Sequence, residues 1–169
     1  MRYFIVPCDM DLDSIISTYA YYEFIIIAGF DVKCFLNERM NKKIEEVFNQ
    51  LNVNLDIENN MKFDDNIILL NKTESILPKY IDKNKVTEII SLKNGDFSEF
   101  SDANLKIESV SLLSTLILER YREYEILPSL NLICLLNELY KRLDFKLTGR
   151  DKIIENYINL LYENRFNIE

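Results

Sequence analysis

The sequence of 169 residues contains no histidine. The absence of imidazole excludes every histidine-dependent catalytic triad and every zinc site that needs a histidine ligand. Glycine and proline are scarce, with three residues each, which leaves little room for linkers. The three cysteines, Cys8, Cys34 and Cys134, form no C-x-x-C pair, and their odd number argues against a disulfide framework. We expect them to be reduced, buried, small hydrophobic residues of a cytoplasmic protein.

Long apolar runs and basic clusters are also missing. No apolar run approaches the roughly 20 residues of a membrane-spanning helix, and the N-terminus has no signal-peptide pattern. The formal net charge is −8, and no dense run of lysine and arginine offsets it. Because such a surface repels phosphate backbones, we expect no autonomous tight nucleic-acid binding, whereas a basic protein partner suits the charge.

The residues that are present predict an α/β domain. Short apolar or alternating runs indicate strands at 3–6, 31–36, 66–70, 86–92 and around 105–107. A helix capped by Asp13 or Ser14 and ending near Gly29 follows the first strand, and Asn41 caps a second helix. Alternating strands and helices imply parallel pairing. We therefore expect a parallel twisted sheet of about five strands, flanked by helices, with a helical C-terminal third.

Helix signals dominate the C-terminal third. An apolar stripe runs over 112–121, and Pro128 is expected near the first turn of the next helix. Residues 148–151 resemble a capping box, with Asp151 in place of the usual glutamate, so they are expected to open the last helix. The polar stretch 93–104 is predicted to be a surface loop, and a helical turn is predicted near 76–81.

Three carboxylates, Asp9, Asp11 and Asp13, occupy alternate positions between the first strand and the first helix. This is the carboxyl edge of the sheet, where open α/β folds bind ligands, and carboxylate oxygens are the ligands that Mg²⁺ and Mn²⁺ prefer. Aspartate also favours helix N-termini, so simple capping explains the same pattern. A calcium-binding EF-hand loop is excluded, because Ser14 replaces its glycine and Ala20 stands where its last glutamate should be.

Residues 11–21, D-L-D-S-I-I-S-T-Y-A-Y, resemble the first motif of the DHH phosphoesterase superfamily. That motif reads H-x-x-x-D-x-D-S/A and leads into a helix rich in small residues. The superfamily includes manganese-dependent inorganic pyrophosphatases, RecJ nucleases and exopolyphosphatases. The helix, break and helix at 135–161 also resemble the family. The resemblance implies a single DHH-type N-terminal domain over residues 1–169, without the DHH-associated C-terminal domain.

Most metal-ligand positions that the resemblance implies carry other residues. Asp11 and Asp13 remain, with Asp9 beside them, whereas the lost ligands fall at Pro7, near Asn71, at Ser91, Leu92 and Lys93, and near Lys141. A two-metal site needs several carboxylates and imidazoles to hold its ions. We therefore expect a pseudoenzyme with no catalytic residues and no metal cofactor. We also expect Lys72, Lys93 or Lys141 to neutralise the remaining aspartates.

Inactive relatives suggest a function. The replication factor Cdc-forty-five looks like a RecJ relative without nuclease ligands and bridges the GINS complex and the MCM helicase, and archaeal RecJ-like chains also bind GINS. The resemblance therefore implies a protein-binding scaffold in the replication helicase assembly, associated with the nucleoid, with candidate interface segments at 98–107 and 157–166. Two alternatives remain open. One is a residual Mn- or Mg-dependent phosphoesterase that uses Asp9, Asp11 and Asp13, and the other is an unrelated α/β interaction domain.

Overall fold

The computed structural model describes residues 2–36, 38–59, 65–71, 81–92, 97, 99–100 and 102–166. In this part of the chain, five strands pair in parallel in the order β2-β1-β3-β4-β5. They are β1 (Arg2–Pro7), β2 (Asp31–Cys34), β3 (Asn66–Leu70), β4 (Val86–Ser91) and β5 (Asn104–Ile107). The predicted α/β class and the five-stranded parallel sheet are confirmed.

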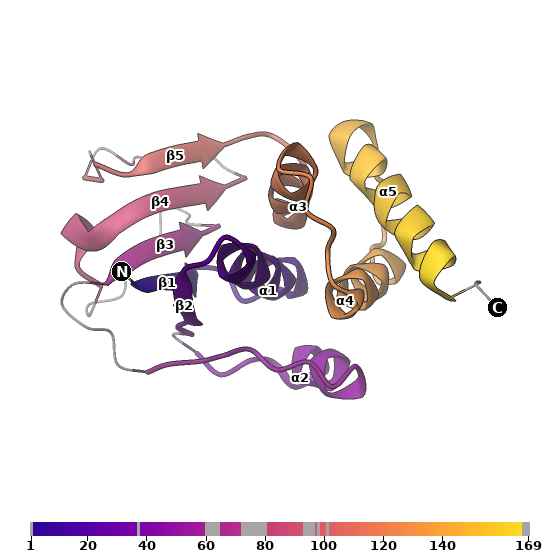
Figure 1. Cartoon of the computed structure of the whole chain (residues 1–169), viewed down its shortest axis with the longest axis horizontal. Helices are drawn as coiled ribbons and strands as arrows, with labels where there is room; N and C mark the ends of the chain where they lie inside the picture. Colours follow the sequence, from indigo (N-terminus) through magenta and orange to yellow (C-terminus); the bar gives the residue numbers. More distant parts are fainter. Residues whose placement is uncertain are drawn as a thin grey trace.

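The helices form layers on one face of this sheet and beyond it. They are α1 (Leu12–Ile27), α2 (Lys42–Gln50), α3 (Leu113–Glu123), α4 (Leu130–Lys141) and α5 (Gly149–Phe166), with a short 3₁₀ turn, η1 (Lys83–Lys85), before β4. Helix α1 packs against β1, β2 and β3, α3 and α4 pack against α1, and α5 packs against α3 and α4. Figure 1 shows α3, α4 and α5 stacked beyond the carboxyl ends of the strands. The helical C-terminal third is therefore confirmed.

Apolar side chains cover both faces of the central strands, as expected for parallel strands that are buried on both sides. On the α1 face, Ile5 and Ile68 belong to the larger core cluster, which continues through α1, α3, α4 and α5. On the opposite face, Phe4 and Leu69 belong to a second cluster. Helix α1 lies between the sheet and the other helices, so most of its circumference is apolar or small.

Pro128 lies directly before Ser129, the N-cap of α4, and so near the first turn as expected. The helix ends differ from the sequence-based expectations in two places. The N-cap of α1 is Asp11, whereas Asp13 lies inside the first turn. Asp151 does not open α5 as part of a capping box, because its carboxylate bonds to the start of α3. Gly29, with a φ of 93°, follows α1 as expected, and Asn41 caps α2.

Other expectations are corrected or fall outside the described residues. Phe97 and Phe100 are buried in the second core cluster, so the stretch 93–104 is not simply a surface loop. Of the turn predicted at 76–81, only residue 81 lies within the described part of the chain. No disulfide joins Cys8, Cys34 and Cys134, and only Cys34 is fully buried. Within the described ranges, no helix is both long enough and apolar enough to cross a membrane.

Candidate functional site

The three aspartates lie at the point where the sheet reverses its strand order. The chain passes from β1 to β2 on one side of β1 and returns to β3 on the other side, so β1 and β3 are neighbours. Ligands of open α/β folds bind at the carboxyl ends of such a pair. Residues 9–13, which we call the acidic loop, follow β1, and Asn71 follows β3. The predicted position of the aspartates at the carboxyl edge is therefore confirmed.

The first two carboxylates of the acidic loop accept hydrogen bonds from the loop itself. Asp9 Oδ1 accepts from the backbone N–H of Asp11 at 3.2 Å. Asp11 Oδ1 accepts from the backbone N–H of Ser14 at 2.8 Å and so caps α1. Both interactions are local, since they satisfy donors that a turn and a helix start leave free.

Asp13 has a different role, because its side chain is buried and reaches another helix. Its Oδ2 accepts from the backbone N–H of Leu113 at 2.7 Å, and its Oδ1 accepts from that of Ser114 at 3.1 Å. The N-cap of α3 is Leu112, which offers no side-chain acceptor. The first turn of α1 thus provides the cap that α3 lacks, and the carboxylate lies at the positive end of the α3 dipole.

Asp151, in the first turn of α5, completes the capping of α3. It accepts from the backbone N–H groups of Ser111 at 2.8 Å and Leu112 at 3.1 Å, and from the Thr115 hydroxyl at 2.6 Å. Both aspartates are buried. Two carboxylates from remote parts of the chain therefore satisfy the donors at the start of α3 and tie this helix to α1 and α5.

The surroundings of Asp13 affect its protonation. Burial raises the pKa of Asp13 to about 6, against hydrogen bonds from Ser114 and Leu113 that lower it, and the charge of Asp11 raises it further. The buried hydroxyl of Tyr140, on α4, has no hydrogen-bond partner among the described residues. Burial and the charges of Asp13, Glu155 and Asp151 raise the pKa of Tyr140, so this hydroxyl stays protonated.

The structure describes some of the positions at which the resemblance implies lost metal ligands. Pro7 ends β1, Ser91 ends β4 and is buried, and Leu92 packs at the edge of the larger core cluster. Asn71, with a φ of 58°, donates from Nδ2 to the Ser14 hydroxyl at 2.9 Å. Asparagine tolerates this left-handed backbone better than most residues. Lys93 lies outside the described residues. At these positions the structure thus shows the apolar side chain of Leu92, the pyrrolidine ring of Pro7, and the small polar side chains of Ser91 and Asn71.

Lys141 does not neutralise the aspartates. Its side chain is exposed and its Nζ lies 3.5 Å from Glu138 Oε1, on the same helix. Lys72, like Lys93, lies outside the described residues. For Asp13, the backbone N–H groups of α3 occupy the place that we assigned to a lysine. These donors come 100 residues later in the chain, and the one sequence signal for them was a helix start without a good cap at Leu112.

The metal ions of the DHH phosphoesterases do not fit this donor set. Among the described residues, no group of three histidine, cysteine, aspartate or glutamate side chains could hold a metal ion. Each carboxylate of the acidic loop instead accepts a hydrogen bond from the protein's own backbone. A two-metal site requires several ligands that converge on ions about 3.5–4 Å apart.

The strand order and the parallel crossovers define an open α/β fold with the acidic loop at its strand reversal, which is compatible with the DHH-type domain that residues 11–21 resemble. Comparison with solved structures agrees. The chain is similar to a candidate family II inorganic pyrophosphatase from Methanococcus jannaschii, with a TM-score of 0.73, 20% identity, and coverage of 96% of this chain and 56% of that one. It is also similar to CDC45 from Entamoeba histolytica, with a TM-score of 0.48, 10% identity, and coverage of 100% and 34%.

The sequence itself matches no protein-family model and no curated protein. The similarity to the pyrophosphatase therefore shows a shared fold alone, and this chain spans about half of the length of that protein. This shared fold agrees with the resemblance of residues 11–21 to the first DHH motif.

Proposed function

We propose that this chain is a catalytically inactive DHH-like domain that acts as a protein-binding scaffold. The observation that carries the proposal is the use of Asp11 and Asp13, because both carboxylates hold the starts of helices. A hydrolytic two-metal site would need several further ligands that converge on the same ions as these carboxylates. The acidic loop thus serves the fold at the place where a relative would bind metal.

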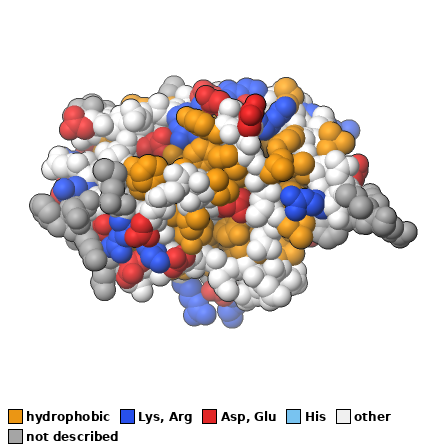
Figure 2. Space-filling model, viewed as in Figure 1, with side chains coloured by type: hydrophobic (Ala, Val, Ile, Leu, Met, Phe, Trp, Pro, Cys, Tyr) orange, Lys and Arg blue, Asp and Glu red, His pale blue; other side chains and the backbone are white. Residues whose placement is uncertain are grey.

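Exposed apolar side chains support the binding role. Tyr124, Leu127 and Leu130, between α3 and α4, are all exposed, and we call them the α3–α4 surface. The Tyr124 ring lies 5.6 Å from that of Phe24, so this surface borders α1. Figure 2 shows hydrophobic side chains gathered where Figure 1 places α1. Exposed apolar patches mark interaction sites, and tyrosine is enriched in them.

The replication setting rests on the sequence resemblance to inactive RecJ-like proteins. It makes a GINS-type complex and the MCM helicase the first partners to test. The net charge of −8 suits a basic protein surface better than a nucleic acid. Of the two interface segments expected from sequence, 98–107 exposes Leu105 but buries Phe100, and 157–166 exposes Leu160.

A hydrolysis assay tests the inactive state. The purified chain would be incubated with Mn²⁺ or Mg²⁺ and either pyrophosphate or single-stranded DNA, and released phosphate or nucleotide would be measured. We expect no turnover and no rise in melting temperature with Mn²⁺. Manganese-dependent turnover that Asp9→Asn abolishes would overturn the proposal. Asp9 is the suitable change, because it caps neither α1 nor α3.

A binding assay tests the scaffold role. The chain would be mixed with purified GINS and MCM, and the mass of the complex would be measured by light scattering after gel filtration. We expect a one-to-one complex that Leu127→Asp disrupts. The matched control is Ile153→Asp, which places the same charge on an exposed apolar residue of α5. If neither protein binds, the replication setting is wrong, while the hydrolysis assay still decides the inactive state.

A further inference from the structure

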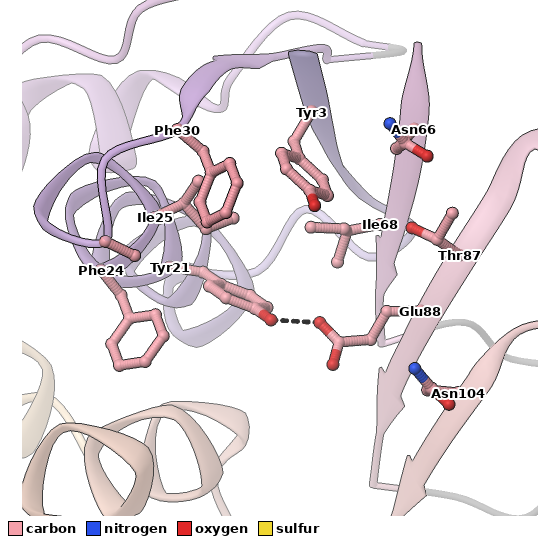
Figure 3. Close-up of a pocket in the computed structure, with 11 residues that line it drawn as sticks. Tyr3, Tyr21, Phe24, Ile25, Phe30, Asn66, Ile68, Thr87, Glu88 and Asn104 are labelled. Carbon is pink, nitrogen blue, oxygen red and sulfur yellow. Dashed lines mark hydrogen bonds between the residues drawn. The ribbon is translucent and has the colours of Figure 1, made fainter. Parts of the chain in front are cut away.

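A cavity lies at the opposite, amino edge of the sheet. It has a volume of about 300 Å³ and lies between the second half of α1 and the beginnings of β3, β4 and β5. Figure 3 shows two unlike walls. Aromatic rings of Tyr3, Tyr21, Phe24 and Phe30 form one wall, and the polar side chains of Asn66, Thr87, Glu88 and Asn104 form the other.

The sheet register explains why this space exists. Ile5, Ile68, Glu88 and Asn104 are consecutive partners across β1, β3, β4 and β5, so their side chains share the α1 face. Helix α1 packs against β1, β2 and β3. Beneath α1, on β1 and β3, this row of residues is therefore apolar. Beyond α1, on β4 and β5, the row is polar and lines the cavity.

The Glu88 carboxylate is fixed in place by two residues from separate helices. The Tyr21 hydroxyl, on α1, donates a hydrogen bond to Oε1. Arg120 Nη2, on α3, lies 2.9 Å from Oε2, and Arg120 Nη1 donates to the Tyr21 oxygen at 2.6 Å. Arg120 balances the charge of Glu88, and each carboxylate oxygen retains a further lone pair. The carboxylate can thus accept an N–H from a ligand that carries no charge.

Packing alone does not account for this group. A largely buried ion pair commonly stabilises a fold less than apolar side chains of similar volume would. The β3–β4 register also shifts between Ile67 and Ile68, next to Thr87 and Glu88. Irregularities of this kind re-aim side chains and are over-represented beside functional sites. Two independent features therefore indicate that Glu88 is presented to the cavity.

The other polar side chains on this wall make only weak hydrogen bonds within the protein. The Asn66 amide and the Thr87 hydroxyl make hydrogen bonds of 3.5 Å, which are long, and the Asn104 amide bonds to no described residue. Among the described residues that line the cavity, none is lysine or arginine, so an anionic ligand has no counter-charge there. The volume is at the lower end of ligand sites and suits a single ring system.

We propose that this cavity binds one planar, uncharged heteroaromatic ring with an N–H donor on its edge, such as a free nucleobase. The ring lies against the aromatic wall, its N–H donates to Glu88, and its remaining edge meets the amides of Asn66 and Asn104. This site uses the edge of the sheet opposite the acidic loop and does not depend on the proposed scaffold function.

The test is a titration of the full ¹⁵N-labelled chain, followed by its amide NMR signals. The probes are adenine and cytosine, which carry N–H donors, pyridine, a ring without one, and N-acetyl-tryptophanamide, which represents a protein side chain. We expect saturable shifts of Thr87, Glu88 and Asn104 with adenine or cytosine, and binding of pyridine at least about tenfold weaker, since it lacks the bond to a charged acceptor.

Variants locate the site. Glu88→Gln should weaken adenine or cytosine binding by about tenfold. Asn104→Ala, at an exposed position, should weaken it by a smaller factor, and it carries the test if Glu88→Gln does not fold. Ile153→Ala, on α5, is the control and should change nothing. The proposal is overturned if no ring binds saturably, if pyridine binds as well as adenine and cytosine, or if only N-acetyl-tryptophanamide binds.

Discussion

The two edges of the sheet use charged side chains in opposite ways. At the carboxyl edge, the three carboxylates of the acidic loop all bond to the protein's own backbone, and Asp13 is buried in doing so. At the amino edge, Glu88 is held by the side chains of Tyr21 and Arg120 and faces a cavity. The first arrangement holds the starts of helices, and the second places a carboxylate at a cavity.

This difference predicts different consequences of mutation at the two edges. The carboxyl edge holds side chains whose loss should mainly affect stability. The amino edge holds the Glu88–Arg120 ion pair, and replacing both residues together by apolar ones should change the free energy of unfolding little. Mutations at the two edges can therefore test whether the contrast holds.

The largest effect is expected for Asp151→Ala. The change removes the acceptor of two backbone N–H groups and the Thr115 hydroxyl, all at the start of α3. Because buried donors without partners cost about 1–3 kcal/mol each, we expect a loss of about 4 kcal/mol in the free energy of unfolding, measured by urea denaturation. Asp144→Ala, at an exposed position, is the control and should change it by less than about 0.5 kcal/mol.

The pH dependence of Asp13 comes next. Its pKa is about 6 in the folded chain and about 3.8 when exposed, so the folded state holds a proton that the unfolded state releases between these values. Stability from this group should therefore rise as the pH falls from about 6 to about 4, by about 3 kcal/mol. The measurement is the unfolding free energy of the wild type minus that of Asp13→Asn, at several pH values. A difference that does not change with pH would contradict the assignment.

At the amino edge, single and double changes should differ. Arg120→Met leaves Glu88 largely buried without its counter-charge, and we expect a loss of about 2 kcal/mol. Glu88→Leu combined with Arg120→Met replaces the pair by apolar groups and should cost less than the single change. Thermal and urea unfolding of both variants, with Glu88→Leu alone, completes a double-mutant cycle. A double variant that is less stable than Arg120→Met would show that the pair itself stabilises the fold.

Local patterns in the sequence predicted the fold well. The strand at 66–70 matches β3 to the residue, because its apolar run ends in polar residues on both sides. The N-cap of α1 was displaced by two residues, since three aspartates at alternate positions all suit a helix start and only the backbone path selects Asp11. Local chemistry thus predicted this strand and this helix, but it did not select the N-cap of the helix among the three aspartates.

The candidate sites were harder to predict, because they depend on contacts that are distant in sequence. Asp13 meets α3 across 100 residues, and Tyr21 meets Glu88 across 67. Nothing in the pattern around Glu88 distinguishes it from an exposed strand residue until β4 is placed beside β3 and α1 covers only part of the sheet. Composition excluded histidine chemistry, but only tertiary structure shows what the remaining carboxylates do.

The smallest expected effect separates two neighbours within the acidic loop. Asp11→Ala removes the N-cap of α1 and should lower the free energy of unfolding by about 1 kcal/mol. Asp9→Ala removes one long hydrogen bond of 3.2 Å at an exposed turn and should cost less than about 0.5 kcal/mol. Both changes remove one carboxylate from the same loop, so a metal-binding loop would lose metal-dependent stabilisation with either one. The free energy of unfolding of both variants, measured with and without Mn²⁺, distinguishes capping from metal binding. Capping alone predicts that Asp11→Ala costs more than Asp9→Ala and that Mn²⁺ changes neither value.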